Sequence, residues 1–328
     1  MIIRLIFFSL IFLFFSCSDT SEQDAFVNKA NPETQKTNEK EGVQIVVLGT
    51  VQDAGSPHAG CKKDCCKGLF SQPNPNRKVV ALGLIDYESQ QNWMFEATPD
   101  LSTQMKLLKS YCSFQEKETP DGLFLTHAHI GHYAGLMYLG REAMNAKDVP
   151  VYAMPKMKSF LEQNGPWSQL ITLKNIRIEE LKNESSLFLN QRIKVVPFLV
   201  PHRDEFSETV GYKVIGPNKS ALFIPDIDKW GKWDKSIIEE ISSVDFAFLD
   251  ATFYDAEEIN NRNISEIPHP FIIESMSLFK DLTDSEKNKI YFIHLNHTNP
   301  ALIEESNAYK TIHENGFHVA RINQAFEL

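Results

Sequence analysis

The chain has little positive charge: 33 Lys and Arg residues stand against 43 Asp and Glu residues, which gives a formal net charge of −10. A polyanion such as tRNA or DNA needs a basic patch, and because the sequence offers none we expect no nucleic-acid partner. Internal repeats, low-complexity runs and Gly/Pro/Ser-rich linkers are missing from residues 43–328. We therefore predict one domain there, with an ordinary 42% of apolar residues to build its core.

Long apolar runs are also scarce, and the clearest one lies at the N-terminus. Leu5 to Phe15 is too short to span a bilayer, which takes about 20 residues, so residues 1–17 are predicted to be a signal peptide. The run ends in Leu13-Phe-Phe-Ser-Cys17, which resembles the lipobox of bacterial lipoproteins. Residues 18–42 are polar and read as a disordered tether. We expect an exported protein anchored by lipid at Cys17, on the periplasmic side or at the outer membrane; the alternative is a plain cleaved signal peptide.

Histidine is sparse as well, but three of the 10 histidines lie close together, in Leu123-Phe-Leu-Thr-His-Ala-His-Ile-Gly-His132. His127 and His129 are two residues apart, so in an extended segment their side chains leave on the same face. His132 follows where a helix-like pattern begins. Neutral imidazole is a common metal ligand, so this strand, loop and helix predict a metal site. The alternative is three solvated loop histidines.

Three later strand-like runs also end in a potential metal ligand. They are Ile193 to His202, Ala221 to Asp226 and Ile290 to His294. Further strands are expected at residues 43–50, 79–87 and 92–96, and helices at 105–111, 137–144 and 156–164. The pattern indicates an α/β fold.

These motifs resemble the metallo-β-lactamase superfamily, whose signature is His-x-His-x-Asp-His after a strand. The resemblance implies an αββα sandwich with metals at one sheet edge. It also implies one metal position at His127, His129 and His202, a bridging Asp226, and a second position at His132 and His294. Gly131 stands where the signature has Asp, and Asp228 could replace that carboxylate only if its loop bends inward. We therefore expect one well-held zinc with a position open for water, and a second site that is weak or filled differently; Mn or Fe remain alternatives.

The Cys cluster in Gly60-Cys-Lys-Lys-Asp-Cys-Cys66 adds a finer resemblance. Pyrroloquinoline-quinone biosynthesis protein B and the cyclic phosphodiesterases of phosphonate breakdown carry a Cys cluster at this position, bound to a structural zinc. The resemblance implies such a site at Cys61, Cys65, Cys66 and His297. The competing interpretation is one disulfide formed from the three clustered Cys residues and Cys112, since an exported protein meets an oxidising compartment.

The resemblance favours a zinc hydrolase that acts on a small phosphodiester or ester-like substrate, with His269 as the proton donor. For His269 the alternative is a loop histidine between two prolines, and Asp250 is interpreted as structural. Two other functions stay open: a role like that of the quinone-biosynthesis protein, and metal binding without catalysis.

Overall fold

The structure is a computed structural model and describes residues 41–260 and 263–328. The predicted signal peptide, the lipidation site Cys17 and nearly all of the predicted tether lie outside the described residues. In the described part of the chain no helix combines the length and the apolar composition needed to cross a membrane.

The first sheet has seven strands in the order β14-β1-β2-β3-β4-β5-β6. The strands β1, β2 and β3 form an antiparallel meander, and β4, β5 and β6 follow in parallel. Their bounds are Val43–Gly49 (β1), Ala81–Asp86 (β2), Gln91–Phe95 (β3), Gly122–Phe124 (β4), Val149–Ala153 (β5), Ile176–Glu180 (β6) and Ala325–Glu327 (β14). The antiparallel start agrees with the three consecutive strands predicted from the sequence.

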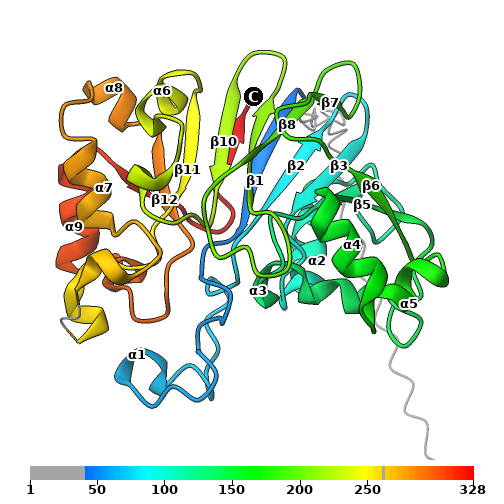
Figure 1. Ribbon diagram of the computed structural model, residues 1–328, viewed down its shortest axis with the longest axis horizontal. Helices are drawn as coiled ribbons and strands as arrows, with labels where there is room; N and C mark the ends of the chain where they lie inside the picture. Colours follow the sequence, from blue (N-terminus) through cyan, green and yellow to red (C-terminus); the bar gives the residue numbers. More distant parts are fainter. Residues whose placement is uncertain (1–40, 261–262) are drawn as a thin grey trace, which may run out of the picture. The chain divides into compact units, whose positions relative to one another are not determined.

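The second sheet mirrors the first, with the order β13-β12-β11-β10-β9-β8-β7 (Figure 1). Here β7 to β10 are antiparallel neighbours, whereas β10 to β13 are parallel. The bounds are Leu187–Phe188 (β7), Lys194–Leu199 (β8), Val210–Ile215 (β9), Ser220–Ile224 (β10), Phe246–Asp250 (β11), Ile290–Ile293 (β12) and His318–Val319 (β13).

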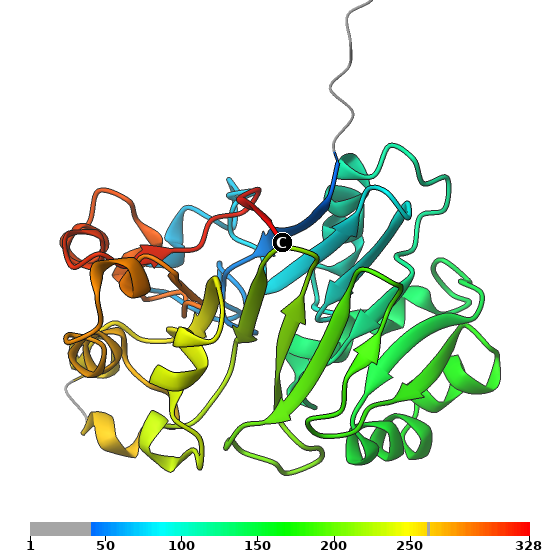
Figure 2. The same cartoon turned by 90° about the horizontal axis from the view of Figure 1, so that it is seen from above.

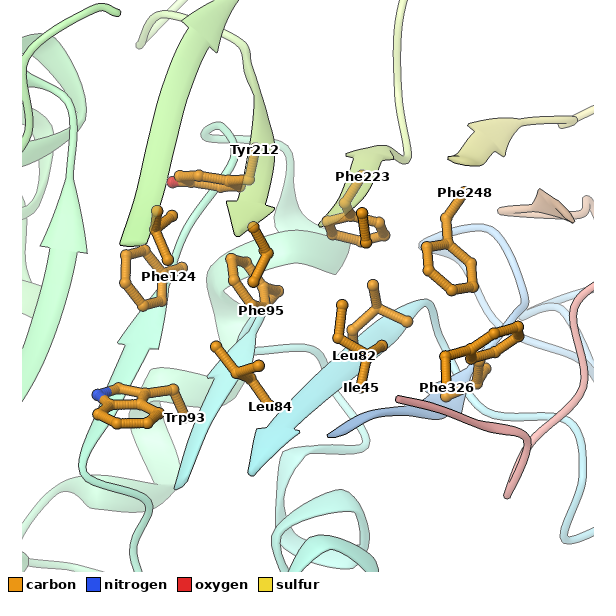
Figure 3. Close-up of a cluster of buried hydrophobic side chains, with 14 of the residues drawn as sticks. Ile45, Leu82, Leu84, Trp93, Phe95, Phe124, Tyr212, Phe223, Phe248 and Phe326 are labelled. Atoms are coloured by element: carbon orange, nitrogen blue, oxygen red, sulfur yellow. The ribbon is translucent and has the colours of Figure 1, made fainter. Parts of the chain in front are cut away.

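The main core lies between the two sheets and is rich in aromatic side chains. Figure 3 shows Phe95 and Phe124 of the first sheet facing Tyr212 and Phe223 of the second. Phe95 and Phe124 stack with ring centroids 4.9 Å apart, and Tyr212 packs edge-on against Phe124. Fully buried aromatic side chains of this size supply much of the hydrophobic free energy that holds two sheets together.

Helices cover the outer face of each sheet, as the two views show (Figures 1 and 2). On the first sheet they bury a second apolar cluster and are α2 (Leu101–Tyr111), α3 (Ile130–Tyr133), η1 (Ala134–Leu139), α4 (Pro155–Gln163) and α5 (Trp167–Thr172). On the second sheet, a third cluster lies under η2 (Trp230–Lys232), α6 (Ile237–Ser242), α7 (Ile272–Leu278), η5 (Pro300–Leu302) and α9 (Asn307–Glu314). The remaining short helices are α1 (Asp64–Lys67), η3 (Ala256–Ile259), η4 (Ile264–Glu266) and α8 (Asp284–Lys287). The layers form the predicted αββα sandwich.

Two of the three predicted helices are present, and the third is altered. The segment expected to be helical at 137–144 instead forms the 3₁₀ helix η1, which begins at Ala134 and ends at Leu139. It ends there because Gly140 takes an extended backbone conformation, with φ −67° and ψ 168°. A regular α-helix cannot continue through such a residue.

The strand directions bring many strand ends to one edge. Because β1 and β3 are both antiparallel to β2, and β4 is parallel to β3, these three strands end on the same side. By the same argument β8, β10, β11 and β12 end together in the second sheet. Beyond this edge a β-bridge between Val51 and Leu295 joins the two sheets. The loops that follow these strands therefore meet in one place.

Candidate metal centre

Four predicted ligands, each from a loop that follows a strand end, converge at this edge. His127 and His129 follow β4, His202 follows β8, and Asp226 follows β10. One ligand atom from each of these four side chains lies within 4.8 Å of the others. The first metal position expected from the sequence is thus assembled from both sheets.

The distances within this group suit a small metal ion. His127 Nε2 lies 2.8 Å from His129 Nδ1 and 3.3 Å from Asp226 Oδ2. His202 Nε2 is 3.3 Å from the same oxygen, and His129 Nδ1 is 3.9 Å from it. Two ligand atoms on a tetrahedral zinc, each about 2.0–2.2 Å from the metal, lie about 3.4 Å apart. The measured distances lie around that value.

At the first position the pKa shifts favour a neutral imidazole at His127 and an ionised carboxylate at Asp226. Burial lowers the pKa of His127 well below its usual range, and His132 lowers it further. Burial raises the pKa of Asp226, but the positive charges of His269 and His202 outweigh this and hold it well below the usual range. A neutral imidazole beside an ionised carboxylate is the form in which both groups bind metal.

The side chains at the second expected metal position differ from those of the superfamily signature. Asp53, His132 and His294 place one ligand atom each within 4.8 Å of the others, and His132 Nε2 lies 3.8 Å from Asp226 Oδ2. Asp228, the candidate replacement for the missing carboxylate, instead accepts a hydrogen bond from Lys232 at 2.8 Å.

Several buried ring nitrogens in this centre lack a hydrogen-bond partner among the described residues. Among them are Nε2 of His132, His202 and His294. An unpaired buried polar group costs about 1–3 kcal/mol, so native proteins rarely leave three of them together. Metal coordination would satisfy all three, and the residues present therefore fit a metal ion.

Partners behind the histidines select which nitrogen faces the centre. Thr126 Oγ1 lies 2.9 Å from His127 Nδ1, and Thr252 Oγ1 lies 2.8 Å from His294 Nδ1. Glu96 Oε1 lies 3.2 Å from His132 Nδ1. Such outer contacts fix the tautomer and the ring orientation of a metal-binding histidine. Each leaves Nε2 as the atom that faces the centre.

His132 responds strongly to the carboxylates around it. Burial lowers its pKa, but Glu96, Asp53 and Asp226 together outweigh this and raise it to about 9. Sequence reasoning missed Glu96 and Asp53. Both follow the end of a strand, and this is the signal by which Asp226 was found.

His269, the predicted proton donor, lies beside the metal ligands. Its Nδ1 is 2.9 Å from Asp250 Oδ2 and 3.2 Å from Asp226 Oδ1. Burial lowers its pKa, but these two carboxylates outweigh that effect and raise it to about 10. Asp250, His269, His294 and Asp226 also lie close enough to form a ligand group of their own. Asp250, however, already accepts hydrogen bonds from Ile227 N, Thr252 N and Thr252 Oγ1.

A separate cluster brings together the predicted structural-zinc residues. One ligand atom each from Cys61, Cys65, Cys66 and His297 lies within 4.8 Å of the others. Cys65 Sγ is 4.0 Å from Cys61 Sγ and 3.9 Å from Cys66 Sγ, near the edge of about 3.8 Å for two thiolates on tetrahedral zinc. A disulfide would need about 2.05 Å, and no disulfide links these three residues. Cys112 is buried in the helix-side core of the first sheet.

The pKa values within this cluster shift in opposite directions, and a backbone hydrogen bond from Lys63 N lowers that of Cys61. Burial, and then the neighbouring Cys66 and Cys61, raise the pKa of Cys65 to about 12. Burial, His58 and Lys63 lower the pKa of His297 to about 4, so its imidazole is neutral. Three thiolates cannot ionise side by side without a positive charge between them.

Comparison with known proteins identifies the family. The family model of the β-lactamase superfamily domain matches residues 91–295. Coenzyme PQQ synthesis protein B of Methylorubrum extorquens (strain PA1) is 20% identical over 313 residues, which cover 87% of this chain and 100% of the relative. The protein of that name from Methylococcus capsulatus is 24% identical over 306 residues, covering 84% and 97%.

Solved structures agree with this grouping. The structure of Zn²⁺-bound PqqB from Methylobacterium extorquens has a TM-score of 0.71 at 18% identity, and the match covers 87% of this chain and 100% of that one. A diphosphatase from the PhnP family has a TM-score of 0.60 at 21% identity, with 87% and 97% covered. At these identities the structural likeness shows the fold. The chain is similar to coenzyme PQQ synthesis protein B along most of its length, has the metallo-β-lactamase fold and belongs to the β-lactamase superfamily.

Proposed function

We propose that the chain is a metal-dependent hydrolase, with zinc as its metal, that acts on a small phosphodiester or ester-like substrate. The observation that carries the proposal is the group His127, His129, His202 and Asp226, whose ligand atoms lie within 4.8 Å of one another. The three histidines and a carboxylate form a donor set that suits zinc, and Mn or Fe would also accept it. The Zn²⁺-bound relative and the diphosphatase with this fold support the proposal.

Zinc, when bound, would lower the pKa of a bound water to about 7 and so supply hydroxide at neutral pH. The protein itself holds the ligand side chains in the positions that metal binding requires. Thr126, Glu96 and Thr252 orient the rings, and the backbone of the strand ends keeps them in place. Burial excludes water from His132 and His294, which strengthens charge interactions within the centre.

We propose His269 as the group that protonates a leaving oxygen. Its Nδ1 is held by Asp250 and Asp226, which keep the ring positively charged and leave Nε2 as the nitrogen that can release a proton. A positioned general acid typically contributes about 10²–10⁴-fold to the rate. The hydrogen bond to Asp250 places a proton on Nδ1, which argues against metal binding through that atom.

The test is hydrolysis of bis-p-nitrophenyl phosphate by purified protein with added zinc or manganese. Activity should disappear with a chelator and in His127→Ala and His202→Ala. His313→Gln should keep the activity, because His313 lies on α9 and belongs to none of the candidate ligand groups. Metal binding by the wild type without hydrolysis of this or of related esters would instead favour a binding protein that has lost catalysis.

A second candidate is a role like that of coenzyme PQQ synthesis protein B, favoured by relatives of that name at 20–24% identity. The predicted export signal argues against it, because that pathway runs in the cytoplasm. A quinone operon around the gene would support this candidate, and its absence would favour hydrolysis.

We further propose a structural zinc at Cys61, Cys65, Cys66 and His297, supported by the sulfur distances of 3.9 and 4.0 Å. We also propose export and lipid anchoring at Cys17, with no other membrane contact. The partner is a small molecule and not a nucleic acid, in line with the net charge of −10.

A further inference from the structure

We infer that Asp53, in the loop after β1, is the carboxylate ligand of the second metal position and replaces the aspartate that Gly131 lacks. The inference deepens the proposed function and rests on it. It assigns a ligand to a loop that lies far before the histidine motif in the sequence and on a different strand.

A backbone connection between the two sheets holds the loop that carries Asp53. Leu295 N donates to Thr50 O at 2.8 Å, and Gln52 N donates to Leu295 O at 2.9 Å. This parallel bridge fixes the loop after β1 beside the residues that follow β12. Asp53 and His294 lie in these two joined segments, and one ligand atom of each lies within 4.8 Å of the other. The position of Asp53 therefore depends on the pairing of the two sheets and not on a mobile side chain alone.

Asp53 occupies the space beside Gly131 that a side chain at residue 131 would need. A Cβ atom added at Gly131 would lie 1.6 Å from Asp53 Cβ and 2.3 Å from Asp53 Cα. No side chain fits at residue 131 while Asp53 occupies its observed place. The loop after β1 thus fills the volume in which the superfamily signature has its aspartate, and glycine is required there.

The Asp53 carboxylate lies close to two histidines that are candidate metal ligands. One of its oxygens lies within 4.8 Å of a nitrogen of His132 and a nitrogen of His294. Both histidines have a buried Nε2 without a hydrogen-bond partner among the described residues. Gln52 Nε2 donates to Asp53 Oδ1 and thereby orients the carboxylate. Asp226 Oδ2, at 3.8 Å from His132 Nε2 and 3.3 Å from His127 Nε2, can bridge this position to the first.

Native mass spectrometry provides the test, because folded molecules appear at lower charge states than unfolded ones and their metal ions can be counted separately. Purified protein equilibrated with zinc should carry three ions: two at the histidine centre and one at the Cys cluster. Asp53→Asn keeps the size of the side chain but weakens the ligand, and should carry two. Asp228→Asn is the matched control, because its carboxylate is bound to Lys232 at the same edge, and should carry three.

A second variant should remove the same metal ion without changing the Asp53 carboxylate itself. Gly131→Ala leaves the Asp53 carboxylate chemically intact but displaces it, and should lose the same single ion. Three ions on Asp53→Asn would overturn the inference, and so would a wild type with only one ion at the histidine centre. Neither result would contradict the proposed hydrolase function. A wild type with no ion at the histidine centre would overturn the proposed function as well.

Discussion

Replacing Cys61 with serine tests whether a structural zinc fastens the loop after β1. Between Val51 and Val79 only Ser56 and Cys66 are buried, so this segment has almost no apolar core of its own. Within the segment Arg77 donates to Ser56 Oγ at 3.1 Å, and it contacts the rest of the protein by donating to Leu302 O at 3.4 Å. A zinc shared with His297 would connect the segment to the loop after β12.

The expected loss follows from how much the zinc holds. Structural zinc contributes about 10–16 kcal/mol in zinc-finger peptides, where folding depends on it entirely. Here the two sheets keep their own core when the loop opens, so we expect only about 3–5 kcal/mol of global stability to be lost. For a domain of this size 1 kcal/mol shifts Tm by about 2 °C, which predicts a decrease of about 6–10 °C.

The assay combines a thermal melt with zinc counted per chain. Cys61→Ser should lose one zinc and keep the metal at the histidine centre. Cys112→Ala is the matched control: it removes a buried sulfur from the core of the first sheet and should lower Tm without loss of zinc. An unchanged Tm and an unchanged zinc count in Cys61→Ser would refute the structural site. A gain of two hydrogens per chain on reduction of the wild type would establish a disulfide instead.

Three further outcomes are expected. Burial raises the pKa of Glu258 to about 7, so its contribution to stability is full below about pH 4.5 and is lost as the pH rises toward 7. Glu258→Gln should therefore raise the free energy of unfolding, measured with urea, by about 1–2 kcal/mol at pH 8 and leave it unchanged at pH 5. The exposed Glu257→Gln should leave the free energy of unfolding unchanged at both pH values. Thr252→Val removes the oxygen 2.8 Å from His294 Nδ1 and should weaken zinc binding about 10-fold or more in a chelator competition, whereas Thr172→Val on α5 should not. Cys17→Ala should move the protein from the membrane pellet to the soluble fraction, and unchanged partition would refute the lipid anchor.

The sequence predicts most of the strands that carry the ligands, because apolar runs that end in His or Asp are a local signal. The runs before His202, Asp226 and His294 all form strands, β8, β10 and β12. The resemblance to the superfamily then supplies the order of the ligands and the αββα layers. Local periodicity was less reliable at 137–144, where one glycine ended a 3₁₀ helix.

Asp53 was not predicted because its role is not local. Its place beside His294 depends on the bridge between Val51 and Leu295, which are far apart in the sequence and belong to different sheets. The sequence shows that Gly131 lacks a carboxylate but cannot show which distant loop fills the space. Glu96 was missed for a similar reason, since its contact with His132 depends on how β3 lies beside β4.

Anomalous diffraction at the zinc absorption edge, from crystals of the protein purified without chelator, tests the metal centre most directly. The account predicts a strong peak among His127, His129 and His202, a second among Asp53, His132 and His294, and a third among Cys61, Cys65, Cys66 and His297. A map without a peak at the histidines, from crystals grown with zinc, would contradict the central claim that this edge of the sandwich is a metal centre.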